Sequence, residues 1–175
     1  MSEQPTDTGP GPGDPRFAVP ALPPRLVSRD RLIAALDHAS GDGCLVCVTG
    51  GPGAGKTVLL SQWARGRAGR TAWLALTRAD NDPVRFWPLF LQAARATEPV
   101  MLPSVGGGGD VTVVLDAFFA EEGGEQAGVT IVLDDAHLLT DKTIIAGLDR
   151  VVSRWAGRVH LILAARSVPL LPFHG

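Results

Sequence analysis

One stretch of this sequence has the residue types and spacing that bind phosphate. Residues 50–57 read Gly-Gly-Pro-Gly-Ala-Gly-Lys-Thr and match the Walker A pattern G-x-x-x-x-G-K-[ST] at every fixed position. Glycines let backbone N–H groups turn toward phosphate oxygens, and a following helix start adds favourable partial charge. We expect Lys56 to reach the β- and γ-phosphates and Thr57 to offer its hydroxyl to Mg²⁺. Roughly 0.003 accidental matches are expected for this composition, so the pattern indicates a phosphate-binding loop.

A pair of carboxylates follows an apolar segment further along the chain. Residues 130–133 are typical of a buried strand, and Asp134 and Asp135 come directly after it. In open α/β sheets, ligands bind at the carboxyl ends of the strands. We expect Asp134 to hold Mg²⁺, directly or through water, and Asp135 to orient or activate an attacking water. Taken alone, the pair could simply be the first two residues of the following loop. The phosphate-binding loop predicted upstream favours the catalytic interpretation.

Two further residues are candidates for chemistry. Arg166 comes just after the last expected strand, where it can reach the γ-phosphate and report its presence; the alternative is a solvated surface arginine. His137 lies two residues beyond the acidic pair. A histidine at that position is more typical of a structural hydrogen-bonding residue than of a catalytic group.

Hydrophobic spacing predicts strands that alternate with helices. The expected strands cover residues 44–49, 71–76, 129–133 and 159–164; the expected helices begin at Ser28, just after the phosphate loop, at Asp82, at Asp110 and at Thr140. Pro88 should bend the third helix or delay its start. Because the strands are apolar throughout, we expect a mainly parallel sheet covered on both faces. This is the α/β, three-layer sandwich of P-loop NTPases.

Composition narrows the possibilities further. The chain has 175 residues, is 45% hydrophobic and carries a net charge of −2, which excludes a generally basic nucleic-acid binder. No apolar run approaches the length of a membrane span, and the N-terminus does not resemble a signal peptide, so we expect a cytoplasmic protein without membrane contact. Seven of 14 prolines fall within residues 1–24, which predicts a disordered tail ahead of one domain over residues 25–175. Cys44 and Cys47 are interpreted as core residues.

The motifs together resemble the nucleotide-binding domain of STAND-class P-loop NTPases, and more narrowly that of MalT-like large regulators of the LuxR family. Besides the phosphate loop, three stretches carry the resemblance: residues 24–32; Ala72–Leu76 with the following Asp80-Asn81-Asp82-Pro83 and Phe86-Trp87; and Leu133–Leu139 with the later Ala165-Arg166. Ser28 and Ala165 stand where such proteins often have Gly and Ser, and neither difference removes a phosphate ligand.

The resemblance implies a switch that binds ATP or ADP with Mg²⁺, with weak ATPase activity at most. It also places the segment around Arg29 near the adenine. The expected nucleotide-binding residues are Arg29, Gly50, Gly51, Pro52, Gly53, Ala54, Gly55, Lys56, Thr57 and Val58; the metal ligands are Thr57 and Asp134; and the catalytic residues are Lys56, Asp135 and Arg166.

Intact regulators of this kind continue with a further strand, a winged-helix region, a sensor and a DNA-binding domain. The resemblance therefore implies a domain that is incomplete at its C-terminus, makes no direct DNA contact and self-associates, if at all, within the intact regulator. Two alternatives stay open: a stand-alone P-loop ATPase or small-molecule kinase, and a folded remnant that no longer binds nucleotide.

Overall fold

Four apolar segments form one parallel sheet in the computed structural model, which describes residues 14–42, 45–67, 71–95 and 128–167. The strands are β1 (Leu45–Thr49), β2 (Thr71–Ala75), β3 (Val129–Asp134) and β4 (Val159–Ala165), and their order across the sheet is β1-β4-β3-β2. The last strand in the sequence therefore pairs with both β1 and β3. All three pairings are parallel, so the carboxyl ends of the strands lie at one edge of the sheet.

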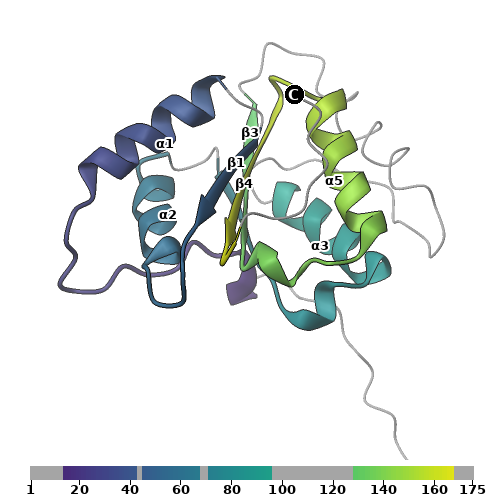
Figure 1. Ribbon diagram of the computed structural model, residues 1–175, viewed down its shortest axis with the longest axis horizontal. Helices are drawn as coiled ribbons and strands as arrows, with labels where there is room; N and C mark the ends of the chain where they lie inside the picture. The colour runs from purple at the N-terminus through teal and green to yellow at the C-terminus, as the bar shows by residue number, and fades with distance from the viewer. Residues whose placement is uncertain (1–13, 43–44, 68–70, 96–127, 168–175) are drawn as a thin grey trace, which may run out of the picture.

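Helices cover both faces of this sheet (Figure 1). They are α1 (Asp30–Asp42), α2 (Lys56–Arg65), α3 (Pro83–Arg95) and α5 (Lys142–Arg154). Val132 of β3 packs in the cluster that contains α1 and α2 residues, whereas its neighbours Ile131 and Leu133 pack in the cluster of α3 and α5. This alternation buries both faces of the strand, as the apolar sequence predicted. The predicted α/β three-layer sandwich is confirmed.

Several details of the elements differ from expectation. The cap of α5 is Asp141, whose carboxylate accepts the N–H groups of Thr143 and Ile144; it is not Thr140. Pro88 does not delay the start of α3, because the helix begins at Pro83. Pro88 itself lies within the helix, on its exposed side. The expected helix at 110–121 and the glycine run at 106–109 lie outside the described residues. Within the described ranges, every helix is too short or too polar to cross a membrane.

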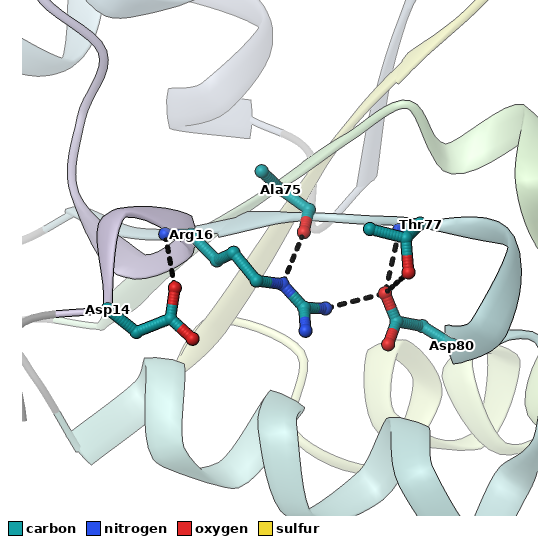
Figure 2. Close-up of polar contacts among 5 residues, drawn as sticks. All are labelled: Asp14, Arg16, Ala75, Thr77 and Asp80. Carbon is teal, nitrogen blue, oxygen red and sulfur yellow. Dashed lines mark hydrogen bonds and ion pairs between the residues drawn. The ribbon is translucent and has the colours of Figure 1, made fainter. Parts of the chain in front are cut away.

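Residues 14–24 require a correction to the predicted tail. The structure places a 3₁₀ helix, η1 (Pro15–Phe17), beside β2, and the chain then runs past α2 to α1 (Figure 1). Arg16 donates to the carbonyl of Ala75 in β2 at 3.2 Å and pairs with Asp80 at 2.5 Å (Figure 2). The composition of residues 1–24 could not predict this attachment, because it depends on the side chain of Arg16 and on partners about 60 residues away in the sequence.

Asp80 is a fully buried carboxylate at the end of a second 3₁₀ helix, η2 (Arg78–Asp80). Burial by itself raises the pKa of Asp80, but hydrogen bonds from the hydroxyl and N–H of Thr77, together with the Arg16 guanidinium, outweigh burial and lower it. A carboxyl whose pKa is lower in the folded state stabilises the fold above its unfolded pKa, and that stabilisation is lost as the pH falls through the folded value.

Replacing Arg16 by Met is expected to destabilise the chain by about 2–3 kcal/mol at pH 7, because it leaves the buried Asp80 charge without its cation. Denaturant unfolding at a series of pH values checks this. The penalty should begin to shrink as the pH falls below about 4, the unfolded pKa, and should disappear only below the lower folded pKa of Asp80. Arg78→Met, at an exposed arginine of η2, is the matched control and should stay within about 0.5 kcal/mol of wild type. Equal losses of stability in Arg16→Met and Arg78→Met would contradict the role of Arg16 as the cation that stabilises the Asp80 carboxylate.

Candidate functional site

The predicted phosphate-binding loop, residues 50–57, follows β1 and runs into the start of α2, as the sequence indicated. Gly53 and Gly55 adopt positive φ values of 75° and 80°, a conformation that favours glycine. A side chain at Gly55 would also approach the Arg29 guanidinium to 3.1 Å. Two of the glycines in the motif are therefore required by backbone conformation, and one of these also by the close approach of a neighbouring side chain.

Arg29 connects the segment ahead of α1 with this loop. Its guanidinium donates to the carbonyl of Ala54 at 2.9 Å and lies beside Gly55. The resemblance placed Arg29 near a bound nucleotide; the structure places it at the rim of the phosphate-binding loop.

Lys56 begins α2, and its ammonium group stays within the loop. It donates to the carbonyl oxygens of Gly50 at 2.6 Å and of Gly51 at 3.1 Å. These bonds hold a positive charge among the loop residues, and no carboxylate of the described residues forms an ion pair with it. The charge is therefore available to a phosphate, with which it would form a stronger, charge-assisted hydrogen bond.

The two expected metal ligands, which are 77 residues apart in the sequence, are in direct contact. The hydroxyl of Thr57 donates to the Asp134 carboxylate, at 2.9 Å from one oxygen and 3.2 Å from the other. Asp134 ends β3 and is only 6% exposed. Burial raises the pKa of Asp134; the Thr57 bond works against this, and the neighbouring charge of Asp135 adds to it. Burial disfavours the charged form of such a carboxylate, and a cation bound beside it would stabilise that charged form.

Asp135 has an unusual backbone conformation, with a φ of 59° in the left-handed region. This conformation is uncommon outside glycine, although Asp adopts it more readily than most residues, and such residues cluster at active sites and ligand clamps. The turn that begins there leads into η3 (Ala136–Leu138) and leaves the Asp135 side chain 57% exposed.

A cavity of about 410 Å³ joins the loop to these residues. Its lining consists of residues that the sequence singled out: Pro52, Gly53, Gly55, Lys56, Thr57, Val58, Asp135 and Arg166. Arg166 arrives there because β4 ends beside the loop, where the N–H of Gly50 donates to the carbonyl of Ala165. Three further predicted residues, Gly50, Gly51 and Ala54, are outside this lining; their carbonyl groups accept hydrogen bonds from Lys56 and Arg29. Asp134 is outside it too and bonds to Thr57, which is part of the lining.

Asn81 is a structural residue that sequence reasoning quoted but did not interpret. Its amide oxygen accepts the N–H groups of Thr140 and Asp141 at 2.6 and 2.8 Å, and its amide nitrogen donates to the Thr140 hydroxyl at 2.9 Å. These bonds fix the far end of the loop that starts with the acidic pair. Asp82, next to Asn81, caps α3 through the N–H of Val84 at 2.9 Å, as predicted.

His137 does not behave as the structural hydrogen-bonding residue we expected. Its Nδ1 atom is buried and has no hydrogen-bond partner among the described residues. The same part of the chain holds no cluster of three His, Cys, Asp or Glu side chains that could bind a metal by themselves.

Solved structures show which class of protein has this fold. The chain aligns with Cdc6p from Pyrobaculum aerophilum at a TM-score of 0.56 and 18% identity, covering 88% of this chain and 43% of that one. The Aeropyrum pernix ORC2 protein gives a TM-score of 0.58 at 18% identity, covering 85% of this chain and 44% of that one. A Drosophila ORC chain bound to DNA gives 0.62 at 15% identity, covering 97% and 49%. The chain therefore has the α/β fold of P-loop NTPases.

Sequence comparison narrows the likeness to one kind of protein. The HTH-type transcriptional regulator MalT of Cronobacter sakazakii is 29% identical over 152 residues, and that of Vibrio cholerae is 28% identical over 153. Each alignment covers 83% of this chain, but the chain spans only 16% of the length of either regulator. No protein-family model matches the chain. The resemblance to MalT-like regulators, which the motifs indicated, is confirmed.

Asp134→Asn is expected to raise the melting temperature of the nucleotide-free chain at pH 7 by about 2–4 °C, the shift that ~1 kcal/mol produces at this size. The free-energy cost of the buried charge appears as the pH rises from the unfolded pKa to the raised folded pKa, and the neutral amide removes that cost. The difference in melting temperature between Asp134→Asn and wild type should vanish near pH 4, the unfolded pKa of an aspartate. Thermal unfolding measures both effects.

Asp135→Asn is the control for this substitution, since the Asp135 side chain is largely exposed and Asn also tolerates the left-handed conformation. It should raise the melting temperature by less than Asp134→Asn does, because it removes only the contribution of the Asp135 charge and leaves the larger cost of burying Asp134 in place. A lower melting temperature for Asp134→Asn than for wild type would show that the carboxylate stabilises the nucleotide-free fold.

Proposed function

We propose that this chain is a nucleotide-binding switch domain that holds ATP or ADP with Mg²⁺. The observation that carries the proposal is one cavity lined by residues of the phosphate loop, Asp135 and Arg166; Thr57 is part of its lining and bonds to Asp134. Loop N–H groups and Lys56 supply positive charge for the β- and γ-phosphates. Arg166 and Arg29 approach the loop from β4 and from the segment ahead of α1.

The Thr57–Asp134 pair fits a hard divalent cation. One hydroxyl and one carboxylate, completed by phosphate and water oxygens, is the incomplete protein shell that Mg²⁺ prefers in nucleotide sites. When bound, Mg²⁺ would neutralise charge on the phosphates. Asp134 would hold the cation, and Thr57 would turn its hydroxyl oxygen toward it. The raised pKa of Asp134 supports this role, because binding a cation relieves the cost of burying the carboxylate.

The similarity to MalT regulators supports a role in transcriptional control. We infer that the domain serves as the nucleotide-dependent module of a LuxR-type regulator, located in the cytoplasm, whose DNA contact belongs to other parts of such a protein. Hydrolysis would reset the bound state, with Asp135 acting on the attacking water. The structure of the Aeropyrum pernix ORC2 protein contains ADPNP and ADP, which supports an adenine nucleotide as the ligand of this fold.

Lys56→Ala is expected to weaken binding of a fluorescent ATP analogue with Mg²⁺ by about 10- to 100-fold, because a hydrogen bond to a charged phosphate is worth about 1.5–3 kcal/mol. Direct titration of the 175-residue chain measures the dissociation constants. Lys142→Ala, which removes the chain's other lysine at the exposed start of α5, should bind as wild type does. Equal affinity of the Lys56→Ala chain and wild type would refute the proposed phosphate site.

A further inference from the structure

His137 and Asp135 form a close pair that the proposed site does not yet explain. The Nδ1 atom of His137 lies 3.7 Å from one carboxylate oxygen of Asp135. That separation is too long for a hydrogen bond. The His137 side chain is 17% exposed, whereas that of Asp135 is 57% exposed and borders the cavity. The pair therefore runs from the protein interior to the candidate site.

The buried member of this pair, His137, has a ring nitrogen whose hydrogen-bonding capacity is not satisfied among the described residues. Nδ1 of His137 has no solvent contact and no hydrogen-bond partner within the described ranges. Buried polar atoms are nearly always paired, so an orphan beside a functional site needs an explanation. The nearest charged partner recorded for it is the Asp135 carboxylate. Closing the gap by about 1 Å would give Nδ1 its missing bond.

No hydrogen bond among the described residues holds the Asp135 side chain in place. It stands in the left-handed conformation at the junction of β3 and η3, and more than half of its side chain is exposed. An exposed carboxylate on a short turn samples several rotamers unless another group holds it. His137, two residues further along the same turn, is packed well enough to provide that restraint.

We propose that His137 is a positioning residue for Asp135, donating a hydrogen bond from Nδ1 to the Asp135 carboxylate when nucleotide is bound. The inference rests on the proposed function. One carboxylate oxygen then binds His137, and the other accepts a proton from water. The water oxygen bonds to the γ-phosphorus while the bond to the β,γ-bridging oxygen breaks. ADP leaves, and the proton passes from Asp135 to the phosphate product. Bonds from catalytic groups are often long without substrate and shorten in its complex.

Two substitutions separate this role from a purely structural one. Asn at position 137 can place an amide N–H near the position of Nδ1, whereas Gln carries its amide near that of Nε2. We expect His137→Gln to lower the single-turnover rate of ATP hydrolysis by about 10- to 100-fold at saturating Mg-ATP, with a dissociation constant within about threefold of wild type. His137→Asn should retain most of the rate. Melting temperatures of both variants show whether each folds.

A double-mutant cycle with Asp135→Asn completes the test. If His137 acts through Asp135, adding His137→Gln to Asp135→Asn should lower the rate no further. Equal rates for wild type and His137→Gln, or equal losses for the Asn and Gln variants, would overturn the inference. Nucleotide binding by wild type without hydrolysis would overturn it too, while leaving the proposed switch function standing. Absence of binding by wild type would remove both.

Discussion

The pairing of β4 between β1 and β3 is the constraint on which the rest of the structure depends. Parallel strands present their carboxyl ends at one edge, so this pairing brings the phosphate loop after β1, the acidic pair after β3 and Arg166 after β4 to a single place. The bond from Gly50 to Ala165 joins two of these ends directly. With β4 elsewhere in the order, the same motifs would not share a cavity.

Features that reduce the stability of this fold gather at that edge. Asp134 is a buried carboxylate with a raised pKa, Asp135 has a left-handed backbone, and Nδ1 of His137 has no hydrogen-bond partner in the part of the chain that the structure describes. The core beneath is apolar and covered on both faces of the sheet. A rigid sheet can hold such groups in place, and local strain concentrated beside a cavity is typical of a site prepared for a ligand.

The loop after β2 shows how three successive polar residues can perform three structural tasks. Asp80 pairs with Arg16 and binds Thr77, Asn81 fixes the loop that follows the acidic pair, and Asp82 caps α3. Figure 2 shows the first of these, in which the segment ahead of α1 is attached to the edge of the sheet. The segment before α1 and the loop after β3 are thus both connected to this one turn.

The sequence by itself determined the position of the glycine-rich loop, the four strands and the covered parallel sheet, because these depend on local spacing and hydrophobic pattern. Tertiary structure alone decided the contacts between distant residues: the Arg16–Asp80 pair, the Asn81 bonds and the burial of Asp134. Even Gly147, unremarkable in sequence, is required because a Cβ there would lie 2.2 Å from Trp87. Such contacts join positions about 60 residues apart, and no local pattern encodes which side chains the folded sheet will bring together.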